Sequence, residues 1–190
     1  MSTYDPTAVR PAPRPMRRAD REVLEASQIA DILEHSQVVH VSYEDGEGQT
    51  VIPVHFAYEY RPEAPNRYDR DGRGRRGTVV LYMYSAREGR KMDAIAAADN
   101  ALPVAFEMEC DQMIYAGRTP CASTTAFRSI VGTGTAMLIE DPAEKTRVLD
   151  MLTNRLVGQP FDRPEAARAV AVWKIESDSF TAKHHPMLQA

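Results

Sequence analysis

The sequence predicts a mainly β protein with a few helices, in which six or seven antiparallel strands form a closed or split barrel. Short apolar or alternating segments recur along the chain and are separated by turn-forming residues. No two of these segments are joined by the regular helical crossover of a doubly wound parallel sheet. Because such barrels bind ligands at an opening or at a seam between subunits, we expect a site at one of these places.

The composition is that of one soluble domain. The 190 residues, 43% of them hydrophobic, are sufficient for a complete core, and the net charge of -4 argues against nucleic acid as a partner. Neither a signal peptide nor an apolar run of about 18 residues is present, which predicts a protein that does not enter the membrane. Cys110 and Cys121 have no CxxC spacing and predict a reducing, cytoplasmic setting.

The first residues predict an arm followed by a helix. Residues 1–15 contain four prolines and little apolar content, which predicts a flexible N-terminal arm. A helix capped by Ser27 then continues through His35. Its apolar face is formed by residues spaced three and four apart, namely Ile29, Ile32 and Leu33.

A proline interrupts the second arm of a predicted hairpin. The first arm, residues 38–43, alternates apolar and polar side chains and ends at a glycine-rich turn. The second arm is expected to be one strand over residues 50–60, and Pro53 within it has no N–H to donate to a sheet. Pro53 therefore lies at an edge, at a bulge, or where the strand backbone faces a ligand. His55 is expected to share a face with Pro53 and Ala57.

Residues 61–77 form a long loop rich in arginine, proline and glycine between two strand patterns. Two interpretations are open. The loop is a solvated insertion in a hairpin, or it contacts an acidic partner.

Residues 79–102 combine a short apolar strand with a helix start of unusual charge. Ser85 and Glu88 have the spacing of a capping box, which predicts that the helix begins at Ser85. Arg87, Arg90 and Lys91 then occupy the first two turns, where the helix dipole disfavours cations. A bound anion would reverse this effect, so the stretch predicts a phosphate site. The alternative is a solvated basic helix end.

The remaining segments complete the predicted barrel. Strands are expected over residues 103–110, 122–139 and 169–175, with a loop from Asp111 to Pro120. The second of these strands carries two glycines two residues apart, namely Gly132 and Gly134. They permit close approach of a backbone or a flat ligand, or they mark a barrel corner. A helix capped by Asp141 precedes the last strand, which contains the only tryptophan, Trp173.

Five segments together resemble the flavin-binding split barrels related to pyridoxamine 5′-phosphate oxidase, and in particular their nitroimidazole-resistance-like branch. The segments follow one another in the order of that family, and they are residues 16–22, 52–58, 84–91, 127–134 and 174–176. The resemblance covers residues 16–183, which it implies form one six- to seven-stranded antiparallel split barrel, followed by a C-terminal tail at 184–190. The arginine-rich loop departs from the compact hairpin of relatives.

The resemblance implies a homodimer with FMN at the subunit interface. Pro53, Val54, His55 and Phe56 would lie along the flavin ring. The phosphate would be bound at the start of the basic helix by Ser85, Ala86 and Lys91, with Arg87 or Arg90 in support. Tyr84 stands where some relatives carry a histidine. A further wall would be formed by Arg128, Ser129 and Ile130.

The activity implied is FMN-dependent reduction of a small organic acceptor, such as a nitroaromatic compound, with electrons from a nicotinamide donor. Alternatives are the deazaflavin F420 or heme as cofactor, a non-catalytic flavin- or heme-binding sensor, and pyridoxamine phosphate oxidation. No acid–base pair stands out in the sequence, so the catalytic residues are unassigned. His55 is either structural or a proton donor. His184 and His185 lack partners for a metal site.

Overall fold

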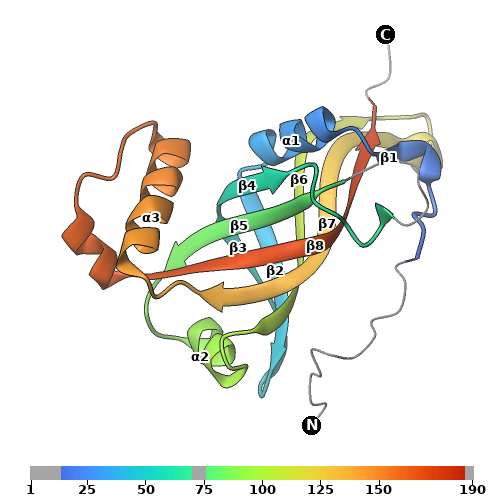
Figure 1. Cartoon of the computed structure of the whole chain (residues 1–190). Helices are drawn as coiled ribbons and strands as arrows, with labels where there is room; N and C mark the ends of the chain where they lie inside the picture. Colours follow the sequence, from blue (N-terminus) through green and yellow to red (C-terminus); the bar gives the residue numbers. More distant parts are fainter. Residues whose placement is uncertain (1–13, 70–75, 187–190) are drawn as a thin grey trace.

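The computed structural model describes residues 14–69 and 76–186, and these form one antiparallel sheet curled into a barrel (Figure 1). The strands lie in the order β3-β2-β6-β7-β8-β5-β4, and β1 pairs with β8. Their bounds are Glu22–Val23 (β1), Val38–Asp45 (β2), Gly48–His55 (β3), Ala57–Arg61 (β4), Thr78–Ser85 (β5), Leu102–Tyr115 (β6), Thr124–Leu138 (β7) and Ala171–His185 (β8). The predicted split barrel is confirmed. The predicted arm at 1–15 lies almost entirely outside the described residues.

The barrel is split between two strands that are neighbours in sequence. β3 pairs with β2 while β4 pairs with β5, so the two strands lie at opposite edges of the sheet order. Phe56 alone joins them. The prediction of one strand over residues 50–60 is therefore wrong, and His55 is exposed whereas Ala57 is buried. Pro53 lies opposite His40 on the edge strand β3, as its missing N–H predicts.

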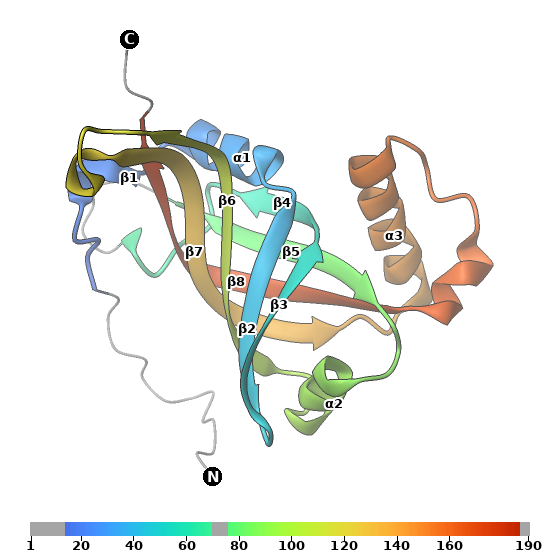
Figure 2. The ribbon, with the colours of Figure 1, turned by 180° about the vertical axis from the view of Figure 1, so that it is seen from behind.

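Two helices cover opposite ends of the barrel (Figures 1 and 2). α1, Ala26–His35, buries the predicted Ile29, Ile32 and Leu33 completely. α2, Arg90–Ala97, buries Met92 and Ile95 at the other end. Both helices therefore close a core that the strands enclose.

The third helix packs against the outside of the barrel. α3, Pro142–Val157, begins as predicted at Asp141, whose side chain accepts a hydrogen bond from the Glu144 amide at 2.8 Å. A second apolar cluster joins it to the outer face of β4, β5 and β8 and to the short helix η4, Pro164–Ala169. None of the helices in the described ranges has the length and apolar character required to cross a bilayer.

The two glycines of β7 are explained by packing inside the barrel. A Cβ atom on Gly132 would lie 2.5 Å from the Phe106 ring, and one on Gly134 would lie 2.5 Å from the Glu176 carbonyl oxygen. Neighbouring side chains and backbone of the same chain already occupy this space. Close approach of a backbone is therefore confirmed at Gly134, and at Gly132 a neighbouring side chain takes the space.

Several predicted boundaries shift. β6 continues to Tyr115 through a bulge after Cys110, where Asp111 has φ +54°, in place of the expected loop. β8 runs to His185, so it includes two residues of the predicted tail. The arginine-rich loop connects β4 to β5, and Arg76 at its end is buried between Glu22 and Asp69. The sequence had not distinguished Arg76 from the other arginines of this loop.

Candidate functional site

β3 is an edge strand with an exposed outer face. Its residues alternate, so that Pro53 and His55 are exposed while Val54 is half-buried against the core. Phe56 at its end is completely buried. The His55 Nδ1 lies 3.0 Å from the Gln37 carbonyl oxygen. Only Pro53 and His55 of the four predicted ring contacts therefore present side chains outward, although all of β3 presents an unpaired backbone edge within the described chain.

The basic helix begins later than predicted. Gly89, with φ +113°, is the N-cap residue, and α2 starts at Arg90. The Ser85 hydroxyl donates to the Ala86 carbonyl at 3.2 Å and caps nothing, so the predicted capping box is wrong. A positive φ that glycine alone adopts easily breaks the helical path after Glu88. The free amides of the helix start consequently lie at Arg90 and Lys91.

Arg90 ties this helix start to the hairpin that leads into β3. Its guanidinium donates to both oxygens of Asp45 at 2.7 and 2.8 Å and to the Gly48 carbonyl at 2.8 Å. Asp45 ends β2 and Gly48 begins β3. The ion pair therefore holds the start of the exposed strand beside the amino-terminal end of α2. Arg87 instead donates to the Arg168 carbonyl at 3.2 Å.

The ion pair between Arg90 and Asp45 should make this junction sensitive to acid. The hydrogen bonds from Arg90 hold the pKa of Asp45 below its ordinary value. A carboxyl with a lowered pKa in the folded chain stabilises the fold above its unfolded pKa of about 4, and this is lost as the pH falls through the lowered pKa. We expect Asp45→Asn to lower the Tm at neutral pH and to match the wild type in strong acid. Thermal unfolding followed by circular dichroism across this pH range measures the difference; an equal difference at every pH would contradict the assignment.

Lys91 is a cation without a carboxylate partner among the described residues. Its Nζ lies 4.5 Å from the centroid of the Trp173 ring, and burial lowers the pKa of its ammonium group. The Trp173 Nε1 is itself buried without a hydrogen-bond partner in the described chain. An uncompensated cation at a helix N-terminus suits an anionic group. The residues at this junction therefore fit the phosphate of a cofactor.

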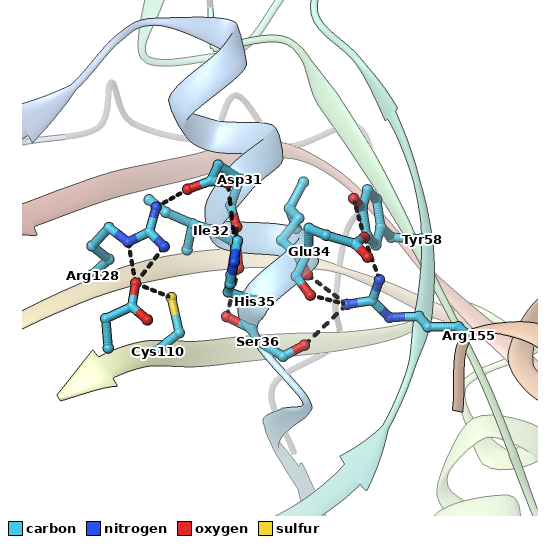
Figure 3. Close-up of polar contacts among 11 residues, drawn as sticks. Asp31, Ile32, Glu34, His35, Ser36, Tyr58, Cys110, Arg128 and Arg155 are labelled. Carbon is cyan, nitrogen blue, oxygen red and sulfur yellow. Dashed lines mark hydrogen bonds and ion pairs between the residues drawn. The ribbon is translucent and has the colours of Figure 1, made fainter. Parts of the chain in front are cut away.

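The third predicted segment lies elsewhere. Arg128, Ser129 and Ile130 are on β7, which β2 and β6 separate from β3. Three strand spacings amount to roughly 14 Å along the sheet. Arg128 forms ion pairs with Asp31 at the side of α1 (Figure 3) and with Asp111, while Ile130 is completely buried. Within one chain Arg90 therefore contacts the start of β3, Ser85 and Ala86 precede it in sequence, Lys91 lies against Trp173 of β8, and the β7 segment lies elsewhere.

Two contributors to this junction were missed from the sequence. Gly89 directly precedes Arg90, and glycine is favoured at an N-cap, so this signal was available. Asp45 lies 45 residues from Arg90 and no local pattern relates them. Tyr84, in contrast, is predicted from the sequence, and the residue is 49% exposed near the end of β5. In the described part of the chain, no three histidine, cysteine, aspartate or glutamate side chains gather as a metal site would require.

A model of the family described as pyridoxamine 5′-phosphate oxidase matches residues 25–184. The chain belongs to this family. The match includes α1 and every strand from β2 onward, with only the last residue of β8 beyond it. None of the curated proteins matches the sequence.

Several solved structures share the fold of this family member at low identity. A candidate 5-nitroimidazole antibiotic resistance protein from Bacteroides thetaiotaomicron is 24% identical, with 85% of each chain covered and a TM-score of 0.64. A flavocytochrome from Azotobacter vinelandii is 18% identical, covering 92% of this chain and 75% of the other, with a TM-score of 0.67. An FAD- and heme-binding protein from Mycobacterium smegmatis is 17% identical, covering 90% and 76%, with a TM-score of 0.66.

Proposed function

We propose that this chain binds FMN and with it reduces a small organic acceptor, such as a nitroaromatic compound. The observation that carries the proposal is Lys91, a half-buried cation without a carboxylate partner in the described chain, at the amino-terminal end of α2. The same helix end is joined through Arg90 to the exposed edge strand β3. These contacts support the proposal, because a flavin nucleotide would need both an anion site and an open strand edge.

The residues of the junction would bind different parts of the cofactor. Ser85, the Ala86 amide and Lys91 would hold the phosphate, and Arg90 would fix the distance between helix and strand. Pro53 to Phe56 would supply the backbone edge along the ring. Bound FMN supplies hydride or electron transfer, while the protein supplies position and electrostatics.

We propose further that two copies of the chain form a homodimer with the cofactor at their interface. The outer face of β3, β2, β6 and β7 supports this, because no helix lies across it in Figure 2. It carries exposed apolar side chains, among them Val51 at 61% and Val131 at 52% exposure. In such a dimer Arg128 and Ser129 would reach the cofactor from the second copy.

Spectroscopy of the purified protein tests the cofactor. We expect flavin absorbance bands, saturable FMN titration of the stripped protein, and oxidation of a nicotinamide donor that accelerates when a nitroaromatic acceptor is added. Parallel titrations with F420 and heme distinguish the alternative cofactors. A colourless protein whose spectrum does not respond to FMN would refute the proposal.

The second candidate function is a flavin- or heme-binding sensor without catalysis. Two of the structural neighbours are described as a flavocytochrome and as an FAD- and heme-binding protein, which favours it. It predicts that bound flavin is reduced no faster by common donors than free flavin. An assay for pyridoxal phosphate production separates both candidates from pyridoxamine phosphate oxidation.

A further inference from the structure

Arg155, in the last turn of α3, holds the carboxyl end of α1 (Figure 3). Its guanidinium donates to the backbone carbonyls of Leu33, Glu34 and Ser36 at 2.7, 2.9 and 3.1 Å, and to the Glu34 carboxylate at 2.6 Å. Carbonyls at the end of a helix have no intrahelical donor, so these bonds satisfy groups that would otherwise need water. The Arg155 side chain is only 15% exposed. One side chain therefore fastens α3 to α1.

The same guanidinium lies against the point where the barrel splits. Its central carbon is 5.3 Å from the centroid of the Phe56 ring and 4.9 Å from that of Tyr58. Phe56 is the single residue between β3 and β4, and it is completely buried. A guanidinium over an aromatic face is attractive and, for arginine, geometrically specific. Arg155 thus contacts the residue at which β3 leaves the barrel wall.

Two routes lead from Arg155 to β3. The first is direct, through Phe56 at the end of the strand. The second runs through α1, whose end continues by Ser36 and Gln37 into β2, and Val38 of β2 is paired with His55 of β3. His55 Nδ1 also lies 3.0 Å from the Gln37 carbonyl oxygen. The Arg155 guanidinium therefore contacts Phe56, which follows the last residue of β3, and the segment that leads into β2, which pairs with that residue.

We infer that Arg155 is a positioning residue, which fixes the carboxyl end of β3 and thereby the geometry of the flavin strand. Its effect on flavin rests on the function proposed above, whereas its effect on β3 does not. Loss of this guanidinium leaves β3 paired to β2 but frees Phe56 and the end of α1 to shift. As a consequence, the carboxyl end of β3 is no longer fixed relative to the start of α2 at Arg90.

Arg147 provides a matched control. It lies on the same helix eight positions earlier, with its guanidinium 5.2 Å from the Tyr82 ring centroid and 2.6 Å from the Glu59 carboxylate. Like Arg155 it contacts an aromatic ring and a carboxylate, but none of its hydrogen bonds in the described chain goes to a backbone carbonyl of α1. Its partners outside α3 are Glu59 of β4 and Tyr82 of β5, and no contact of Arg147 with α1 or Phe56 is present in the described chain.

The experiment compares the full-length variants Arg155→Gln, Arg155→Lys and Arg147→Gln. Amide hydrogen exchange of the FMN-free protein reports on β3, and fluorescence titration and visible circular dichroism report on bound FMN. For Arg155→Gln we expect exchange in β3 and FMN Kd each to rise about tenfold, with a changed flavin dichroism. For Arg147→Gln, the same substitution on the same helix, we expect wild-type values of all three, and for Arg155→Lys intermediate ones.

Equal effects of Arg155→Gln and Arg147→Gln on β3 and on FMN would overturn the inference, as would wild-type exchange of β3 in Arg155→Gln. If Arg155→Gln does not fold, Arg155→Lys, which keeps the positive charge, is compared with Arg147→Gln in its place. If the wild type itself binds no FMN, the proposed function fails, and the exchange of β3 alone still decides the role of Arg155.

Discussion

Replacing Lys91 with alanine should weaken FMN binding roughly 10- to 150-fold, the equivalent of about 1.5–3 kcal/mol for a hydrogen bond to a charged group. The reason is that Lys91 has no carboxylate partner in the described chain and is desolvated beside the start of α2. The desolvation that lowers the pKa of Lys91 disfavours its charged form, and the negative charge of a bound phosphate would offset this effect. Fluorescence titration of the stripped protein with FMN measures the change.

Two further variants serve as controls. The first tests whether the loss of affinity comes from the Lys91 charge or from its packing, and the second tests whether it comes from the net charge of the protein. Lys91→Met keeps an apolar stem over Trp173, and we expect it to lose FMN affinity like the alanine variant. Its effect on the stability of the FMN-free protein should be about 1 kcal/mol or less, because loss of the cation–π contact is opposed by relief of desolvation. Lys145→Ala removes the same charge from the cleft between α3 and η4 and should leave FMN affinity unchanged. Unchanged affinity in Lys91→Ala would exclude the phosphate assignment.

The elements that could be predicted were those set by local chemistry. The face of α1 follows from the spacing of Ile29, Ile32 and Leu33, and the start of α3 follows from Asp141 and Pro142. The edge position of Pro53 follows from one missing N–H. Each of these depends on a few neighbouring residues, so an isolated sequence contains the necessary information.

The break at Phe56 could not be predicted in this way. Strand-forming residues continue on both sides of it, and only the partners distinguish the halves, since β3 pairs with β2 and β4 pairs with β5. Those partners are decided by closure of the whole barrel. The capping box failed for a related reason, because the local pattern at Ser85 competed with the positive φ of Gly89.

The sequence predicts an excess of cations at the candidate site, but it does not predict which residues those cations contact. The excess of cations at Arg87, Arg90 and Lys91 indicated an anion, but the structure assigns Arg90 to Asp45 and Arg87 to a backbone carbonyl. Of these three cations, Lys91 alone has no hydrogen bond to a carboxylate or a carbonyl in the described chain, so it is the one that we propose binds the phosphate. A contribution from Arg128 depends on a second chain, and no pattern within one chain specifies where that chain lies.

Replacing Arg76 with methionine should lower the free energy of unfolding by about 3–5 kcal/mol, because it breaks a buried ion pair with Glu22 and a second one with Asp69. The Arg76 side chain is 1% exposed and lies 2.8 Å from Glu22, which is 4% exposed, and 3.1 Å from Asp69. These bonds join the end of the arginine-rich loop to β1, and the Tyr60 hydroxyl donates to the Arg76 carbonyl at 2.8 Å. Urea unfolding followed by circular dichroism measures the loss.

The lost stability should come from the carboxylates that lose their ion pair with Arg76 rather than from the loss of arginine packing, and a second substitution separates the two causes. Adding Glu22→Gln to Arg76→Met should recover part of the stability, because the double variant no longer buries a carboxylate at Glu22 that has lost its ion pair with Arg76. Arg61→Met is the matched control, since Arg61 is 66% exposed and its pair with Glu59 should contribute at most about 1 kcal/mol. If Arg76→Met and Arg61→Met cost the same, the loop is not anchored through Arg76. If the double variant is less stable than Arg76→Met, Glu22 is held by interactions other than this ion pair.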